Sequence, residues 1–473
     1  MSFRSFLSYV LTGVSLLSPF AVPARSGVSP TPPEARVYTD GELSVSPDPD
    51  KSLTVRVPDA GADIYAPPQD ESGYRYGPTI FTNADGSLDV FFAAPGICGE
   101  WDWITYRHSP DGGKSWTAEK KVLGPTAGSE DAFSTCDPGA VFFGGFWYIG
   151  YTSTTDERGV FNHVYVARAG AIDGAYEKWN GSGWGGDPKP IITFDGGADD
   201  WGAGEPSFVV KGETLYIYYT WHYRDSTGRV VRQTRVAEAD AACENWPLTI
   251  REQGVAIEYA DPSCDSADVK YVEDFGKFLA VSTSQRMTED SCVSFYASDD
   301  GLRFAKACDL KTNVAYYCHN AGLSSRPNGH IRLGDPHLIG YAYGPDWAKW
   351  CTRLQRIEIG LADAPDFSDA QNANLRTQPQ YPDRQLIEPI LGITDEQHVY
   401  TLHKGRPQRL HPAAVTPSRQ KLPLLAGVRF SGYDPAVVRI VGGVLIPVGA
   451  GSTTVTASWR GCTVDVPVHV TGG

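Results

Sequence analysis

The chain has 473 residues, 41% of them hydrophobic, which is enough for one large domain and a smaller one with buried cores. It contains 50 Gly and 34 Pro but only 2 Met, and this composition predicts many turns and few helices. The formal net charge of −15 argues against nucleic acid and against an anionic membrane surface as partners, because both are bound through basic patches.

The first residues have the pattern of a secretory signal peptide. Arg4 precedes a mostly apolar run, residues 6–22, and Ala24 fits the cleavage site. The alternative is an uncleaved anchor, for which the run is short. We therefore predict loss of residues 1–24 and a secreted location, extracellular or periplasmic, with residues 25–70 as a linker or N-terminal extension.

Nine cysteines in a chain with a signal peptide predict disulfide bonds, and none of them forms a CxxC pair that would suggest zinc. Cys292 and Cys308 flank Asp300, and a hairpin that turns there would place them opposite each other. We therefore predict a Cys292–Cys308 bridge. Less firmly based pairs are Cys98 with Cys136 and Cys318 with Cys351, while Cys462 is expected to be unpaired.

A strand pattern repeats about every 60 residues between residues 71 and 365. In each unit a turn glycine precedes a strand rich in aromatic and β-branched residues, and further strands follow. The turn glycines are Gly86, Gly145, Gly212, Gly276 and, less regularly, Gly334. Because a β-sandwich would not show such regular spacing, the pattern predicts an all-β fold with a five-bladed β-propeller.

Two segments in this region match a turn motif. Residues 109–116 have the Asp-box pattern S-x-D-x-G-x-x-W, and residues 298–304 are a shorter relative. Asp and Gly suit a tight turn between two strands. We therefore interpret these acidic residues as structural and not as catalytic carboxylates.

The composition changes after residue 365. Residues 366–398 are polar and are predicted to be a linker, whereas residues 399–473 show β alternation. The runs 430–440 and 443–457 resemble the bacterial immunoglobulin-like group 2 domain. This resemblance implies a small β-sandwich, which we expect to contact a cell surface or a polysaccharide.

Three acidic residues have equivalent positions in consecutive repeats. Asp137, Glu205 and Asp268 precede their turn glycines by 8, 7 and 8 residues. Because innermost propeller strands start near the central channel, we expect these carboxylates to share one pocket. Repulsion and burial would raise their pKa values, which provides the acid and base of glycoside hydrolysis. The alternatives are a calcium site or solvated carboxylates at strand ends.

The segments Asp137-Pro138 and Glu205-Pro206-Ser207, each followed by an aromatic strand, resemble glycoside hydrolase family 43 and its clan relatives. The resemblance implies a five-bladed enzyme that acts by inversion, mainly on arabinan, xylan and galactan, with no required cofactor. Glu205 then matches the general acid, and Asp137 matches the carboxylate that orients the acid and tunes its pKa. A structural calcium ion remains compatible with this assignment.

One position departs from the family pattern. The family has its general base in an Asp-Pro pair of blade one, where this chain has Gly77-Pro78. Either another residue supplies the base or hydrolysis has been lost. The available substitutes are Asp268, Glu100 and Asp102.

Several side chains near the predicted pocket mouth could bind sugar. Aromatic residues stack on sugar rings and polar ones donate to hydroxyl groups, although core packing between blades is the alternative for each aromatic residue. The candidates are Tyr76, Trp101, Trp201, Trp221, His222, Arg224 and His319. The sequence thus predicts a secreted glycosidase with a carbohydrate substrate. The alternatives are a non-catalytic carbohydrate-binding propeller and a sialidase-like enzyme, which would need an arginine cluster and a nucleophilic tyrosine.

Overall fold

A computed structural model describes residue 38 and residues 40–67, 73–96, 101–261, 263–363, 392–395, 397–415, 421–424, 428–459 and 462–472. The predicted signal peptide, Cys98, Glu100 and most of the expected linker at 366–398 lie outside this part of the chain. The regular elements of the described residues are β-strands, apart from two short 3-10 helices, η1 (Trp246–Thr249) and η2 (Glu273–Phe275). No described helix is long and apolar enough to span a membrane.

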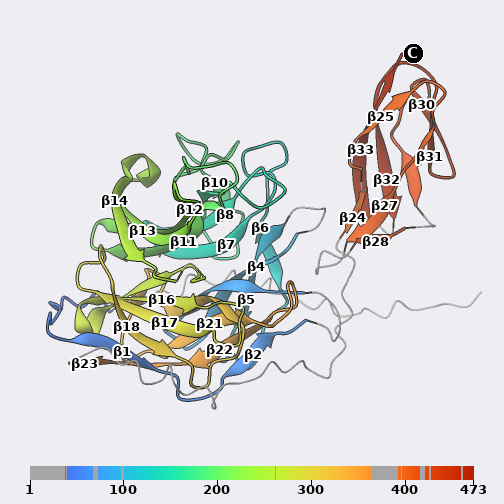
Figure 1. The fold of residues 1–473 in the computed structure, drawn as a ribbon. Helices are drawn as coiled ribbons and strands as arrows, with labels where there is room; N and C mark the ends of the chain where they lie inside the picture. Colours follow the sequence, from blue (N-terminus) through green and yellow to red (C-terminus); the bar gives the residue numbers. More distant parts are fainter. Residues whose placement is uncertain are drawn as a thin grey trace, which may run out of the picture. The chain divides into compact units, whose positions relative to one another are not determined.

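A four-stranded antiparallel meander recurs along the chain, as the repeated turn glycines predicted (Figure 1). The first meander consists of β3 (Tyr76–Thr82), β4 (Leu88–Pro95), β5 (Asp102–Ser109) and β6 (Lys120–Leu123). The second consists of β7 (Cys136–Phe143), β8 (Phe146–Ser153), β9 (His163–Ala169) and β10 (Glu177–Lys178). The third consists of β11 (Gly202–Lys211), β12 (Thr214–Arg224), β13 (Val230–Asp240) and β14 (Arg251–Glu258).

The next two meanders differ in how they are completed. The fourth contains β15 (Asp268–Val272), β16 (Lys277–Ser284), β17 (Cys292–Ser298) and β18 (Ala305–Leu310), and the short β20 (His330–Ile331) pairs with β15 in parallel. The fifth contains β19 (Cys318–Ser325), β21 (Leu338–Tyr343) and β22 (Cys351–Arg356). Its outermost strand comes from the N-terminal side of the chain and is β2 (Ala62–Tyr65), antiparallel to β22.

The fifth meander also joins the first. Strand β19 pairs in parallel with β3 through Ser324 and Ile80, so the two meanders form one eight-stranded sheet. A two-stranded ribbon of β1 (Ser52–Arg56) and β23 (Glu358–Ala362) again brings together the two ends of this region. The resulting arrangement is propeller-like, and the inner strands β3, β7, β11, β15 and β19 are neighbours at its centre.

The inner strands approach one another closely because small residues occupy the contact points. A Cβ atom on Gly139 of β7 would overlap the carbonyl oxygen of Pro206 in β11, and one on Gly322 of β19 would overlap that of Pro78 in β3. Aromatic rings fill the wider space between meanders, as where Trp147 packs 5.1 Å from Phe81. These contacts bring the starts of the inner strands to a common centre.

The C-terminal region forms three smaller sheets with its own core. They comprise β24 (Gly392–Asp395), β27 (Pro412–Val415) and β28 (Lys421–Pro423); β25 (Tyr400–His403), β33 (Cys462–Thr471), β32 (Gly451–Trp459) and β29 (Arg429–Ser431); and β26 (Gln408–Arg409), β31 (Val444–Pro447) and β30 (Val438–Val441). Tyr400, Val438, Val455 and Val468 are buried together. Strand β24 lies within the stretch expected to be linker.

The predicted disulfide pairs are not formed. Val293 pairs with Leu310, and a bulge follows Phe295, so Cys308 lies opposite Phe295 and not opposite Cys292. Cys292 carries a free thiol. The pair Ala297–Ala305 centres the turn on residue 301 and not on residue 300, which moves the partner of Cys292 by two residues, and the bulge moves it by one more.

The other two predicted pairs are not formed either. Cys318 and Cys351 both lie opposite Tyr343, one on each side of it, so a whole strand separates them by about 9–10 Å, beyond the reach of a disulfide. Cys351 and Cys136 are free thiols, as is Cys462, which was expected to be unpaired.

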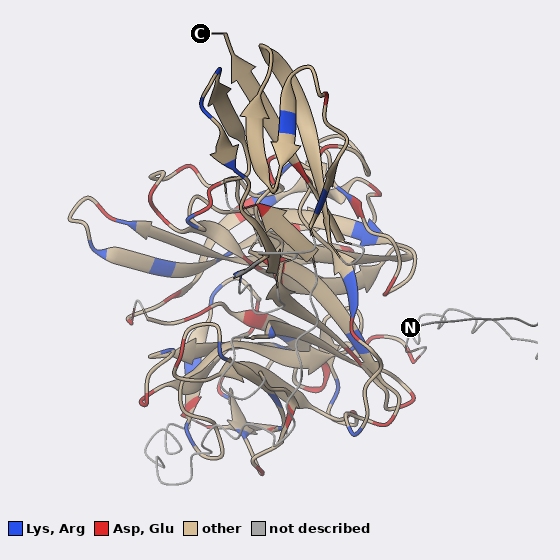
Figure 2. Ribbon diagram, turned by 90° about the vertical axis from the view of Figure 1, so that its right-hand side faces the viewer, with Lys and Arg blue, Asp and Glu red and all other residues tan. Residues whose placement is uncertain are grey.

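Both Asp-box segments are structural turns, as predicted. Asp111 accepts hydrogen bonds from the backbone N–H groups of Lys114 and Ser115, and Asp300 accepts them from Leu302 and Arg303. Acidic and basic residues are interspersed over the ribbon in the view of Figure 2.

Candidate functional site

The inner strands of four meanders share one local distortion. Each has a register shift against its neighbour, in β3, β7, β11 and β19. The residue at each bulge has a positive φ, of 58° for Gly77, 51° for Asp137, 53° for Glu205 and 46° for Asn320. Positive φ is unfavourable for residues other than glycine, and bulges redirect side chains at functional sites. The repeated distortion therefore marks one position around the ring centre.

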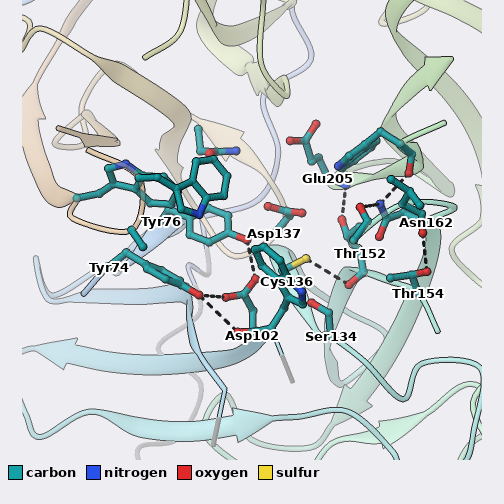
Figure 3. Close-up of a pocket in the computed structure, with 18 of the residues that line it drawn as sticks. Tyr74, Tyr76, Asp102, Ser134, Cys136, Asp137, Thr152, Thr154, Asn162 and Glu205 are labelled. Carbon is teal, nitrogen blue, oxygen red and sulfur yellow. Dashed lines mark hydrogen bonds between the residues drawn. The ribbon is translucent and has the colours of Figure 1, made fainter. Parts of the chain in front are cut away.

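A cavity of about 510 Å³ lies at this position. Figure 3 shows Asp102, Asp137 and Glu205 pointing into it from β5, β7 and β11. One wall is aromatic and consists of Tyr74, Tyr76, Trp347 and Trp350, whose rings contact one another. The polar residues Thr152, Thr154 and Asn162 lie on the opposite side (Figure 3), and the lining also includes Trp101, Trp201, Ser134, Arg158, Arg286 and Asn320. A cavity with one apolar wall and one polar wall suits a ligand that is itself amphipathic, such as a sugar ring.

Glu205 is nearly buried, with 7% of its surface exposed. Its backbone N–H donates to Thr152 Oγ1 at 2.7 Å, and its Oε2 has no hydrogen-bond partner among the described residues. Burial, reinforced by the negative charges of Asp265 and Asp137 and opposed by Arg232, raises the pKa of Glu205 to about 8. Glu205 therefore carries a proton at neutral pH, and its Oε2 is buried without a partner beside the cavity that the residue lines.

The pKa of Asp137 is also raised, to about 7. Burial is the main cause, hydrogen bonds from Thr152 and Cys136 oppose it, and Asp102 and Asp265 add repulsion. The pKa values of both carboxyl groups are therefore raised, because Asp137 and Glu205 share one desolvated space.

Asp102 is a third carboxylate of the cavity and was one of the predicted substitutes for the missing base. It begins β5 and is 3% exposed. The Tyr74 hydroxyl donates to Oδ1 at 2.7 Å and the Tyr76 hydroxyl donates to Oδ2 at 3.0 Å. The pKa of Tyr76 is raised by burial and by the charges of Asp102 and Asp137, so its hydroxyl keeps its proton and remains a donor.

Asp268 does not line this cavity, but it lines an adjacent space of about 30 Å³ together with Asp137 and Glu205. There Ser207 Oγ donates to Oδ1 of Asp268 and the Leu323 N–H donates to Oδ2, each at 2.7 Å. Lys270 forms a salt bridge with it at 2.6 Å. These contacts satisfy the carboxylate within the fold and indicate a structural role.

The turn between β15 and β16 explains why Asp268 lies beside the larger cavity and not in it. Val272 pairs with Lys277 across helix η2, whereas Lys211 pairs with Thr214 in the tighter turn between β11 and β12. Measured from the last pair of each hairpin, Asp268 is therefore equivalent to Ser207, two residues beyond Glu205.

Asp265 is a functional candidate that sequence reasoning missed. It is fully buried, and it accepts a hydrogen bond from the Asn320 N–H at 2.8 Å and pairs with Arg286 at 3.1 Å and Arg232 at 3.5 Å. Burial opposes its ionisation, but the two arginines lower the pKa of Asp265 to about 2. It precedes β15 in a loop, where no periodicity distinguishes it, and only its negative charge just before an inner strand could have signalled it.

Three of the predicted sugar-binding residues line the cavity, namely Tyr76, Trp101 and Trp201. Trp221 instead belongs to the core, where it packs 4.8 Å from Phe194 and beneath Arg235. The structure adds Tyr74, Trp347 and Trp350, which the repeat pattern did not single out because they lie outside the regular strands.

The three predicted polar contacts lie away from the cavity lining. His222 lies against the guanidinium of Arg232 at 3.2 Å, and burial together with the nearby arginines lowers its pKa to about 3. Arg224 points to the loop at Gly228. His319 is fully buried behind Trp350, with ring centroids 4.4 Å apart, and burial lowers its pKa to about 4.

The described residues contain no group of three or more His, Cys, Asp or Glu side chains arranged to hold a metal ion. Two arginines line the cavity, and both are paired with carboxylates, Arg158 with Asp156 and Asp199 and Arg286 with Asp265.

No family model and no curated protein matches this chain. Similar solved structures include a family 117 glycoside hydrolase from the marine bacterium Zobellia galactanivorans, at 14% identity and a TM-score of 0.43 over 65% of this chain and 90% of that one. A thermostable family-43 glycoside hydrolase is 13% identical, with a TM-score of 0.45 over 67% of this chain and 99% of that one. The α-L-arabinofuranosidase of Podospora anserina, solved with cellotriose, is 12% identical, with a TM-score of 0.43 over 65% of this chain and 99% of that one. These structural neighbours are glycoside hydrolases, and the likeness concerns the fold.

Proposed function

We propose that this protein is an exported glycosidase, built on a five-bladed β-propeller with a C-terminal immunoglobulin-like group 2 domain. The substrate is a polysaccharide or oligosaccharide of the arabinan, xylan or galactan type. One observation carries the proposal: a protonated carboxyl, Glu205, shares a cavity with two further carboxylates, between an aromatic wall and a polar wall. An acid paired with a base across a sugar-sized cavity is the arrangement that glycoside hydrolysis requires.

In this mechanism Glu205 donates its proton to the oxygen of the leaving sugar. Its raised pKa keeps that proton available near neutral pH. Asp137 lies beside it and adjusts both its orientation and its proton affinity. Asp102 acts as the general base in place of the residue missing at Gly77, because it is the remaining carboxylate among the described lining residues. Tyr74 and Tyr76 hold both of its oxygens, so its direction toward an attacking water is fixed.

The polar wall and the aromatic wall divide the work of substrate binding. Thr154, Asn162 and Arg286 offer donors and acceptors to hydroxyl groups, while Tyr76 and Trp350 offer ring faces to the C–H side of a sugar. A hydrolysis by inversion would place the attacking water on the Asp102 side and the leaving oxygen on the Glu205 side.

The test is release of reducing sugar from arabinan, xylan, galactan and their oligosaccharides by the exported protein. We expect release from one of these classes, and NMR of the first-formed product should show inverted anomeric configuration. Retained configuration would rule out direct water attack, and no release from any member of the panel would contradict the glycosidase proposal.

The second candidate is a non-catalytic carbohydrate-binding protein. It is favoured by Gly77, since the blade-one position that carries the base in the family resembled by the sequence has no side chain here. Calorimetric binding of an oligosaccharide without any product over a long incubation would support this candidate over the enzyme. A sialidase-like site has less support, because the lining arginines are already paired and Tyr76 keeps its proton.

A further inference from the structure

Trp347 is a large apolar side chain that the fold leaves in solvent. It lies in the connection between β21 and β22, lines the cavity, and is 64% exposed. A tryptophan at the rim of a cavity offers a large apolar ring surface, which a bound ligand would remove from water. Nothing in the proposed chemistry at Glu205 and Asp102 requires this side chain.

The loop that carries Trp347 is held in place. The Gly73 N–H donates to the Ala348 carbonyl at 2.6 Å, and the Trp350 N–H donates to the Gly73 carbonyl at 3.0 Å. Ala348 has a φ of 60°, an unfavourable conformation for alanine that these contacts maintain. The exposed ring therefore has a defined position, which a stacking surface needs if it is to bind without a large loss of conformational entropy.

Trp347 also extends the aromatic wall outward from the carboxylates. Its ring meets Trp350 edge-on at 4.9 Å and 82°. Trp350 in turn contacts Tyr74 at 5.4 Å and Tyr76 at 5.9 Å, and both tyrosine hydroxyls reach Asp102. A continuous line of rings thus runs from the candidate base to the solvent.

Sugar rings present C–H faces that pack on aromatic faces, and consecutive rings of a chain need consecutive platforms. The buried part of the wall takes the ring next to Glu205, so an exposed platform beyond it has room for the neighbouring ring. We infer that Trp347 forms a second sugar-binding subsite at the cavity mouth, and that the ligand is an oligosaccharide of at least two rings. This inference rests on the proposed carbohydrate function.

The experiment measures affinity by calorimetry in the Glu205→Gln background, which prevents turnover. The probes are the monosaccharide and the disaccharide to tetrasaccharide of whichever panel class the wild type cleaves or binds. The variant is Trp347→Ala, and the matched control is Leu248→Ala, which removes a side chain that is also 64% exposed but lies on η1. Thermal unfolding verifies that both variants fold.

We expect the disaccharide to bind more tightly than the monosaccharide, and Trp347→Ala to weaken disaccharide binding roughly three- to tenfold while monosaccharide affinity stays unchanged. The Leu248→Ala variant should retain the full difference in affinity between the disaccharide and the monosaccharide. The inference is overturned if the second ring adds no affinity, if Trp347→Ala weakens both probes equally, or if it weakens neither. It is also overturned if the variant changes only the sedimentation behaviour, because Trp347 would then cover a second copy of the chain. Failure of every probe to bind the otherwise intact protein would instead contradict the proposed function itself.

Discussion

Asp137 and Glu205 occupy the same position in neighbouring inner strands, each at a bulge, each with a φ near 50°, and each directly before a proline. The bulge turns both carboxyl groups into one cavity, and the loss of solvent there raises the pKa of each. The repeated backbone distortion therefore produces the electrostatic coupling on which the proposed chemistry depends.

Replacing Glu205 with Gln should remove the transferable proton while preserving shape. We expect cleavage of a natural oligosaccharide to fall by about 10²- to 10⁴-fold, and cleavage of an aryl glycoside with a good leaving group to fall much less. The measurement is kcat/KM on both substrates. Glu213→Gln, in an exposed turn of the same hairpin, is the control. An equal loss on both substrates would argue against Glu205 as the acid.

The activity should decline as the pH rises through about 8, because the pKa of Glu205 marks loss of its proton. Asp265 and Asp137 raise this pKa and Arg232 lowers it, so Asp265→Asn should move the alkaline limb of the pH–kcat/KM profile to lower pH, by about one pH unit. Asp195→Asn, an exposed substitution, should leave the profile in place. If the alkaline limb of the profile stays in place in Asp265→Asn, Asp265 does not set the pKa of Glu205.

Asp102→Asn should abolish the base while keeping a group of the same size between the two tyrosines. We expect a loss of about 10²- to 10⁴-fold in kcat. Tyr76→Phe removes one of its two tyrosine hydrogen bonds and should cost about tenfold or less. If Asp102→Asn retained full turnover on a natural oligosaccharide, the base would have to come from elsewhere.

Gly77→Asp should restore a carboxylate at the bulge of β3. A Cβ atom there would meet its nearest neighbour, Asp137 Cα, at 3.6 Å, and Asp137 and Asn320 already adopt a similar positive φ. We expect the double variant Gly77→Asp/Asp102→Asn to recover at least tenfold of the kcat lost in Asp102→Asn.

The control for this substitution is Gly86→Asp, which adds the same charge at a turn with a φ of 81° and no neighbour within 4 Å. It should recover nothing in the Asp102→Asn background. Equal activity of the two double variants would mean that the new carboxylate does not reach the reacting centre.

Asp268 should act on stability and not on the pH profile. Its partner Lys270 has a side chain that is only 2% exposed, so Asp268→Asn would leave a buried charge unpaired. We expect a loss of about 3 kcal/mol in the free energy of unfolding, measured with urea, and a smaller loss when Lys270→Met is added. An unchanged unfolding midpoint together with lost activity would return Asp268 to the list of catalytic candidates.

The sequence by itself determined the repeated meanders, the Asp-box turns and the placement of Asp137 and Glu205. These features depend on local chemistry: glycine at positive φ, β-branched and aromatic residues in strands, and proline after the bulged carboxylate. Because each is set by neighbouring residues, each is visible in the printed chain.

Only the tertiary structure decided which groups complete the site. The turn containing η2 placed Asp268 beside the larger cavity and not in it, and the turn position together with the bulge of the β17–β18 hairpin separated Cys292 from Cys308. Asp265 lies near Arg286 and Arg232 because separate strands and loops converge there, and Trp347 extends the aromatic wall because its loop is pinned to Gly73. Side chains alternate along a strand, so a small change in turn length or one bulge changes which of them face the centre, and the residue pattern alone does not record that change.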